Sequence, residues 1–136
     1  MAMIDALKDW FENARGMGVL STADRGGKVN SAVFGRPYFL EHGLIGFIML
    51  KRLNHHNLKS NPYASYLFVE EGKKSEGVRL HLTKTGEEQD SRRIQSISRH
   101  MHDPTVKSAR VLVLFRVDRV LPLVGDDLDK LPFQIE

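Results

Sequence analysis

The sequence contains no cysteine among its 136 residues. This absence excludes disulfides, thiolate nucleophiles and cysteine-ligated zinc, and it favours a cytoplasmic location. No apolar run is long enough to cross a membrane, and the first residues lack the basic and apolar regions of a signal peptide. We therefore expect a cytoplasmic protein that has no membrane partner.

Several motifs that carry chemistry are also missing. The sequence has no Gly-x-Gly-x-x-Gly, no phosphate loop ending in Gly-Lys-Ser/Thr and no Gly-x-Ser-x-Gly elbow. Adjacent residues on a helix point in different directions, so His55 and His56 do not form a metal-ligand pair, and no nearby carboxylate completes a set. The pattern His100-x-His102 is no better placed. We expect no metal site, and no side chain stands out as a general acid or base.

The charge is only mildly basic. Lysine and arginine number 20 against 17 aspartate and glutamate residues, which gives a net charge of +3. Basic residues are scattered among acidic ones, and no motif combines aromatic and basic residues as RNA-binding modules do. We expect no nucleic-acid partner. The length and the 41% hydrophobic content are typical of one globular domain spanning residues 1–136.

Three helices are predicted from apolar spacing and from capping residues. The first is amphipathic, and its Trp10 is expected to pack in the core or at an interface. Asn54 is the predicted N-cap of the second helix, and Pro62 limits that helix. Asp90 is the predicted N-cap of the third. The predicted helices span about residues 4–15, 54–61 and 90–100.

Six segments rich in β-branched and aromatic residues are predicted strands. Glycine turns join the first three as an antiparallel meander, and Pro37 interrupts the second. In the fifth strand Arg79 and His81 share a polar face. The predicted strands are residues 17–23, 29–40, 44–50, 63–69, 78–83 and 111–117, followed by an extended tail. An α+β antiparallel barrel would leave these strands without exposed edges.

Residues 47–62 combine the features of an anion site. A predicted strand ends at Leu50, Lys51 and Arg52 place two cations after it, and a helix begins near Asn54. Free backbone N–H groups and the helix dipole favour negative charge at such a position. The alternative is a solvated basic turn that binds nothing.

The order and spacing of four segments, residues 18–22, 43–49, 57–62 and 63–69, resemble those of the pyridoxamine 5′-phosphate oxidase-like family of FMN-binding split β-barrels. The resemblance covers roughly residues 5–82. It implies an α+β fold, an antiparallel six-stranded split β-barrel with peripheral helices. It also implies a homodimer that holds FMN in a groove between its two subunits.

The resemblance further implies which residues hold the cofactor. The family carries Ser-Arg-Lys before the second helix, where this chain has Arg52-Leu53-Asn54, so the phosphate is expected to rest on Arg52, Asn54 and backbone N–H groups. Arg79 falls near a position that reaches FMN from the partner subunit. The full set of expected cofactor-binding residues is Arg36, Ile48, Met49, Lys51, Arg52, Asn54, His55 and Arg79.

The expected function is that of a flavin-dependent oxidoreductase of unknown substrate. The C-terminal substrate-binding segment of the oxidase is not recognisable, and the only tryptophan is Trp10. Pyridoxamine 5′-phosphate is therefore not the expected substrate. Two alternatives remain open: a non-catalytic flavin carrier or redox sensor, and a split-barrel haem-binding or haem-degrading protein with His55, His56 or His81 as a ligand.

Overall fold

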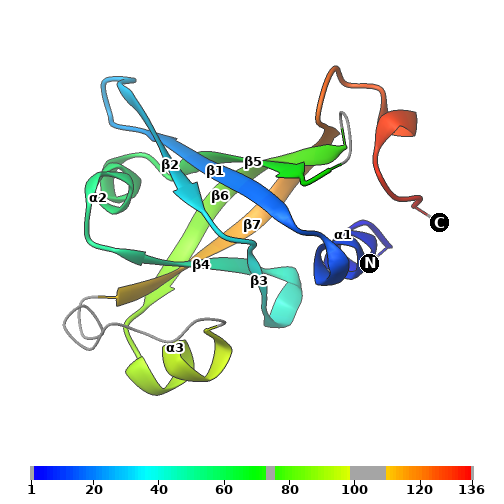
Figure 1. The fold of residues 1–136 in the computed structure, drawn as a ribbon. Coiled ribbons are helices and arrows are strands. Elements are labelled where there is room, and N and C mark those ends of the chain that lie inside the picture. Colours follow the sequence, from blue (N-terminus) through cyan, green and yellow to red (C-terminus); the bar gives the residue numbers. More distant parts are fainter. Residues whose placement is uncertain (1, 73–75, 99–109, 136) are drawn as a thin grey trace.

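The computed structural model describes residues 2–72, 76–98 and 110–135, which form a seven-stranded antiparallel sheet with helices around it (Figure 1). The strand order is β2-β1-β5-β6-β7-β4-β3. The strands are β1 (Gly16–Ala23), β2 (Val29–Phe34), β3 (Tyr38–Phe39), β4 (Ile45–Leu50), β5 (Tyr63–Glu70), β6 (Gly77–Glu88) and β7 (Arg110–Pro122). The helices are α1 (Ala2–Asn13), α2 (Leu53–Ser60) and α3 (Ser91–Ile97), with 3₁₀ turns η1 (Glu41–Gly43) and η3 (Leu128–Lys130).

The sheet is rolled into a barrel, because a short chain segment connects its two edge strands. β2 and β3 are the edges, yet only residues 35–37 separate them in the chain. Such a link spans at most about 14 Å, whereas the edges of a flat seven-stranded sheet lie about 29 Å apart. The predicted α+β split barrel is confirmed. It has seven strands instead of six because the break at Pro37 divides the predicted second strand into β2 and β3.

Both hairpins of the predicted meander form, but they do not join into one continuous meander. β1 pairs with β2, and β3 pairs with β4, but β2 and β3 do not pair with each other. The link at Pro37 carries the chain from one edge of the sheet to the other. On its other side β4 pairs with β7, the last strand in the sequence.

Strand alternation sorts the side chains into a barrel core and an outer face. Along β1, Leu20 and Thr22 are buried while Val19 and Ser21 are only partly buried. Helix α1 covers one end of the barrel, and its Phe11 packs 5.1 Å from Phe68, centroid to centroid. The expected packing role of Trp10 is confirmed, since its ring lies edge-on to Phe11 at 4.8 Å and to Phe68 at 5.8 Å.

The last two strands, β6 and β7, are longer than the sequence predicted, and the tail after β7 folds back. The side chain of Asp90 accepts hydrogen bonds from the N–H groups of Arg92 and Arg93, so the predicted cap of α3 is confirmed. α3 ends at Ile97, and the predicted end near His100 lies outside the described residues. In the tail, Leu131 is buried and Phe133 packs on the core. None of the helices in the described ranges is long and apolar enough to span a bilayer.

Candidate functional site

A buried network of amide and hydroxyl groups holds α2 against β1. Asn54 Oδ1 accepts hydrogen bonds from Thr22 Oγ1 at 2.6 Å and from Asn30 Nδ2 at 3.1 Å, and Asn54 Nδ2 donates to the carbonyl of Leu20 at 3.3 Å. Asn57 Nδ2 donates to Thr22 Oγ1 at 3.1 Å. Buried polar groups require such partners, so this network fixes the start of α2 relative to β1 and β2.

The predicted N-cap of α2 is wrong. Arg52 occupies the N-cap position with an extended backbone, and its carbonyl accepts from the N–H of His56 at 2.9 Å. Asn54 lies inside the first turn, where its side chain is committed to Thr22, Asn30 and Leu20. No side chain caps α2. Its first N–H groups therefore depend on another acceptor, such as water or a ligand anion.

A pocket of about 590 Å³, here called the seam pocket, lies between β2 and β4 and reaches the start of α2. It is lined by residues 30–35, 48–50 and 52–54. Ile48, Met49 and Phe34 give it an apolar wall, and Arg52 gives it a cation at the α2 end. Its volume falls in the usual range for small-molecule sites. These surroundings suit a molecule that has a flat apolar ring and an anionic group.

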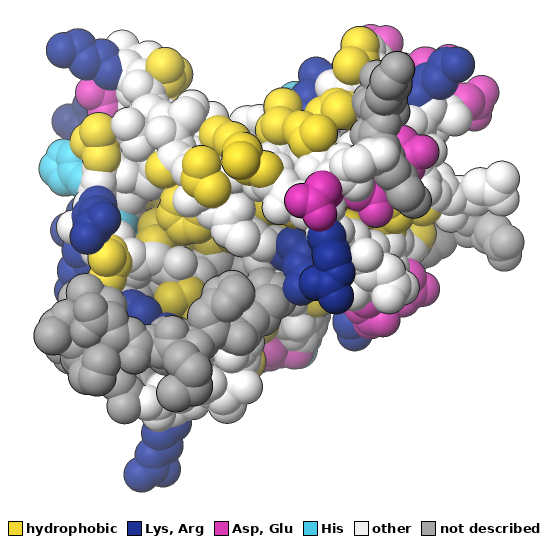
Figure 2. All heavy atoms as spheres, in the orientation of Figure 1, with side chains coloured by type: hydrophobic (Ala, Val, Ile, Leu, Met, Phe, Trp, Pro, Cys, Tyr) yellow, Lys and Arg dark blue, Asp and Glu magenta, His cyan; other side chains and the backbone are white. Residues whose placement is uncertain are grey.

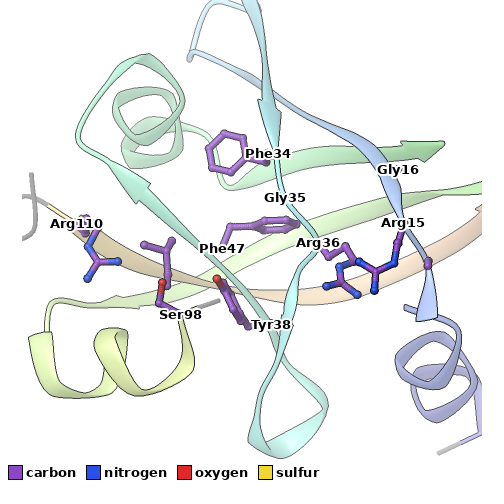
Figure 3. A pocket seen from close by; sticks show the side chains of 11 residues that line it. Arg15, Gly16, Phe34, Gly35, Arg36, Tyr38, Phe47, Ser98 and Arg110 are labelled. Carbon is purple, nitrogen blue, oxygen red and sulfur yellow. The ribbon is translucent and has the colours of Figure 1, made fainter. Parts of the chain in front are cut away.

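A second pocket of about 470 Å³, here called the arginine pocket, adjoins the seam pocket. Both pockets are lined by Phe34, Gly35 and Ile48. Figure 3 shows Arg15 and Arg36 on one side of the arginine pocket and Arg110 on the other, with aromatic rings between them. Its lining residues are Ala14, Arg15, Gly16, Phe34, Gly35, Arg36, Tyr38, Phe47, Ile48, Ser98 and Arg110.

The structure places four of the eight expected cofactor residues together in the seam pocket. They are Ile48, Met49, Arg52 and Asn54. The side chain of Asn54 is used in the network with Thr22. Its backbone N–H in the first turn of α2 is therefore the group of Asn54 that could bind an anion. Lys51 is exposed and lines neither of the two pockets.

Arg36 lines the arginine pocket instead of the seam pocket. Its Nη1 donates to the carbonyl of Phe11 at 2.8 Å, near the C-terminal end of α1. Carbonyl groups at a helix C-terminus carry partial negative charge, so this contact holds the guanidinium against the end of α1.

His55 lies on the buried side of α2 and lines neither pocket. Its Nε2 is 3.2 Å from Oε1 of Glu87, a carboxylate that also accepts from Lys84 Nζ at 2.9 Å. Burial acts to raise the pKa of Glu87, but the hydrogen bonds from Lys84 and His55 outweigh it and lower that pKa. His55 therefore links α2 to β6.

Arg79 lies on the outer face of the sheet and also lines neither pocket. Its guanidinium donates to the carbonyl of Pro122 at 2.8 Å and to the carbonyl of Gly125. β6 lies three strands from β2, a separation of about 14 Å in a sheet. Arg79 is therefore not brought together with Arg52 in the seam pocket.

Sequence reasoning missed an apolar surface on the outer side of β2, β1 and β5. Hydrophobic side chains are exposed over these strands in Figure 2. Val29 is 79% exposed, Val33 is 70% exposed and Met17 is 59% exposed. Register places Val33, Val19 and Leu67 in one row across the three strands. We call the surface formed by Met17, Val19, Val29, Val33, Tyr63, Leu67 and Val69 the outer apolar face.

Solved structures with known folds resemble this chain over most of its length. An FMN-binding protein from Syntrophomonas wolfei subsp. wolfei matches with a TM-score of 0.71 at 19% identity, covering 90% of this chain and 86% of that one. An F420 reductase matches with a TM-score of 0.67 at 12% identity, covering 82% and 94%. A candidate pyridoxamine 5′-phosphate oxidase from Lactobacillus delbrueckii matches with a TM-score of 0.63 at 14% identity, covering 83% and 88%. No protein-family model and no curated protein sequence matches the chain.

Proposed function

Because the chain has the split-barrel fold of the pyridoxamine 5′-phosphate oxidase-like proteins, we propose that it binds FMN in the seam pocket and works as a flavin-dependent oxidoreductase. The observation that carries this proposal is that the two ends of the seam pocket differ, one being cationic and the other apolar. One end has a guanidinium and an uncapped helix start, and the other has apolar strand residues.

The donor set fits FMN. The Arg52 guanidinium and the first N–H groups of α2 would hold the phosphate, since both favour anionic oxygens. Ile48 and Met49 would support the isoalloxazine ring. When bound, FMN would supply the redox chemistry, and the chain would orient the ring and exclude water from one face.

FMN fits better than larger or iron-containing cofactors. The seam pocket has cationic and helix-start groups at only one end, which suits a single phosphate, and the sequence lacks a dinucleotide fingerprint. No histidine lines the seam pocket or the arginine pocket within the described residues, so neither offers the usual axial ligand to haem iron.

The same proposal includes a homodimer. Exposed apolar patches on soluble proteins mark interaction sites, and the outer apolar face lies on β1, β2 and β5. Val33 belongs to this face and also lines the seam pocket, so a second subunit packed there would lie beside the cofactor. That arrangement would allow Arg79 of one subunit to approach FMN held by the other.

Purified protein tests the cofactor directly. We expect paired absorption bands in the blue and near-ultraviolet, either as purified or after reconstitution, and release of FMN on denaturation, identified by mass. A Soret band, released FAD, or no flavin uptake after reconstitution would contradict the proposal. Turnover with a reduced nicotinamide and candidate acceptors then separates an oxidoreductase from a flavin carrier.

A further inference from the structure

Three charged or titratable side chains, which we call the His55 cluster, meet between α2 and β6 and line neither the seam pocket nor the arginine pocket. His55 Nε2 is 3.2 Å from Glu87 Oε1, and Lys84 Nζ donates to the same oxygen at 2.9 Å. The side chains of His55, Lys84 and Glu87 are 3%, 16% and 26% exposed. A carboxylate only accepts hydrogen bonds, so Nε2 of His55 must carry a proton and donate it to Glu87.

A β-bulge in β6 makes this cluster possible. Lys84 is paired with Phe115 and Glu87 with Val113, so three steps along β6 correspond to two along β7. Both partners on β7 are fully buried, and paired residues in an antiparallel sheet share a face, so Lys84 and Glu87 both point to the inner face of the barrel. In a regular strand, residues three apart point to opposite faces. The irregularity between Lys84 and Gly86 therefore brings the two charges together.

The same stretch of β6 also holds the other end of α2. The N–H of Lys84 donates to the carbonyl of Pro62, two residues after the end of α2, at 2.7 Å. In the first turn of α2, Asn54 bonds to Thr22 on β1, and His55 bonds to Glu87 on β6. The first turn is therefore tied to two different strands by consecutive residues.

The chemistry of the cluster favours a role in orientation. Apolar side chains of similar volume would fill this space without the desolvation cost of charged groups. Hydrogen bonds to a carboxylate are directional, so they fix the rotation of the helix where apolar contacts would allow it to shift. Supporting bonds of this kind hold binding groups in the geometry that a ligand needs.

One end of the proposed cofactor site depends on this orientation more than the other. Arg52 directly precedes α2 as its N-cap residue, so a displacement of the first turn moves Arg52 and the first N–H groups together. A guanidinium binds phosphate through two parallel hydrogen bonds only in a narrow geometry. Ile48 and Met49, which would support the flavin ring, belong to β4 and not to α2. Loss of the His55 bond should therefore affect the phosphate more than the ring.

We propose that His55 is a positioning residue for the phosphate of FMN, and that it acts through its bond to Glu87 without contacting the cofactor. This role rests on the proposed function, because it requires the phosphate to lie at the start of α2. The effect expected of the His55 cluster is selectivity for FMN over riboflavin, which has the same ring and ribityl chain but no phosphate.

Fluorescence titration of the apoprotein with FMN and with riboflavin tests this role, and the readout is the ratio of the two dissociation constants. In His55→Leu, FMN affinity should fall about tenfold, whereas riboflavin affinity should change less than about twofold. His55→Gln should keep the wild-type ratio, because its amide nitrogen can donate to Glu87 in place of Nε2. The matched control is His56→Leu, the same substitution at the next position of α2, which is exposed and lines neither pocket. It should leave both affinities unchanged.

A second variant keeps the test independent of the buried position. His55 is buried, so thermal unfolding is measured for every variant, and Glu87→Ala removes the same bond from the more exposed side. Glu87→Ala should lower FMN affinity as His55→Leu does. The double variant should lose no more than either single variant, because both substitutions remove one shared interaction.

The outcomes separate the positioning role from the proposed function. A wild-type ratio in folded His55→Leu and Glu87→Ala, equal losses of FMN and riboflavin, or an FMN loss in His56→Leu equal to that in His55→Leu would overturn the positioning role. His55→Gln that behaves as His55→Leu would overturn it as well. Wild-type protein that binds neither flavin would contradict the proposed function itself, and the positioning role with it. Protein that prefers FMN equally in wild type and in folded His55→Leu would contradict the positioning role alone.

Discussion

Thr22 Oγ1 donates a 2.6 Å hydrogen bond to Asn54 Oδ1 in the buried space between β1 and α2. Both side chains are almost fully buried, at 3% and 5% exposure. The bond joins the C-terminal end of β1 to the first turn of the helix that follows Arg52. The position of the proposed phosphate site therefore depends on a polar contact inside the core.

We expect Thr22→Val to destabilise the fold by about 1–3 kcal/mol, because it keeps the shape but leaves the amides of Asn54 and Asn57 without their hydroxyl partner. Urea denaturation measures the change in the free energy of unfolding. The matched control is Thr85→Val, an exposed threonine on β6, which should change stability much less. Equal effects in the two variants would show that the network does not hold α2.

Arg52→Ala should weaken FMN binding by about 1.5–3 kcal/mol, the scale of a lost charge-assisted hydrogen bond. Arg52→Lys should recover only part of the affinity, since an ammonium group cannot bond phosphate in a bidentate way. Fluorescence titration of the apoprotein with FMN gives both values. Lys59→Ala, at an exposed position in the last turn of α2, is the control and should leave FMN affinity unchanged. Wild-type affinity in a folded Arg52→Ala variant would remove Arg52 from the site.

The ion pair between Glu41 and Arg93 makes part of the stability depend on pH. Arg93 Nη2 lies 2.8 Å from Glu41 Oε1, and this hydrogen bond lowers the pKa of Glu41 from 4.5 to about 2. A carboxyl group with a lowered folded-state pKa stabilises the fold above its unfolded pKa, and this contribution is lost as the pH falls through the folded pKa. The stabilisation should therefore be present above about pH 4.5 and disappear towards pH 2.

Comparison with Glu41→Gln tests this pH dependence. The difference in melting temperature between wild type and the variant should shrink as the pH falls from 4.5 to 2 and should also shrink with added salt, because both partners are partly exposed. Glu71→Gln, at an exposed position in the turn after β5, provides the comparison variant and should show no such trend. A constant difference across that pH range would contradict the assignment.

Local patterns in the sequence predicted most elements of the fold. The Asp90 cap, the break at Pro37 and the apolar segment of β4 each act within a few residues, and their consequences appear where expected. Strand partners could not be predicted in the same way. The pairing of β4 with β7 joins residues 60 to 70 positions apart and depends on closure of the barrel, which no local pattern encodes.

The candidate site was predictable only in part, for the same reason. The position of Arg52, between a predicted strand and a predicted helix, indicated an anion-binding residue without any tertiary information. The inward turn of Asn54 depends on Thr22 and Asn30 in strands far from it in sequence, so propensity alone favoured a capping role. Likewise, the presence of Arg36 and Arg110 around one pocket depends on the sheet order.

Val29→Asp should convert the proposed dimer to a monomer. Val29 is 79% exposed on the outer apolar face, and burying an added carboxylate at a subunit interface is costly. Sedimentation velocity measures the molecular mass in solution. The matched control is Val124→Asp, since Val124 is 71% exposed but lies after β7, away from β1, β2 and β5. A monomeric wild type, or equal dissociation in both variants, would contradict a dimer through this face.

FMN binding and dimerisation should be coupled if Arg79 of one subunit contacts the cofactor held by the other. A ligand that touches both chains stabilises their association by linkage, so added FMN should tighten the dimer and dilution should release FMN.

Arg79→Ala should weaken FMN binding and abolish this coupling. Its hydrogen bonds to Pro122 and Gly125 also anchor the chain after β7, so the stability of the variant is measured in parallel. Arg119→Ala, at an exposed position opposite His81 on β7, is the control and should behave as wild type. The test is sedimentation across a dilution series with and without FMN, and a monomer that keeps FMN stoichiometrically at low concentration would rule out a shared site.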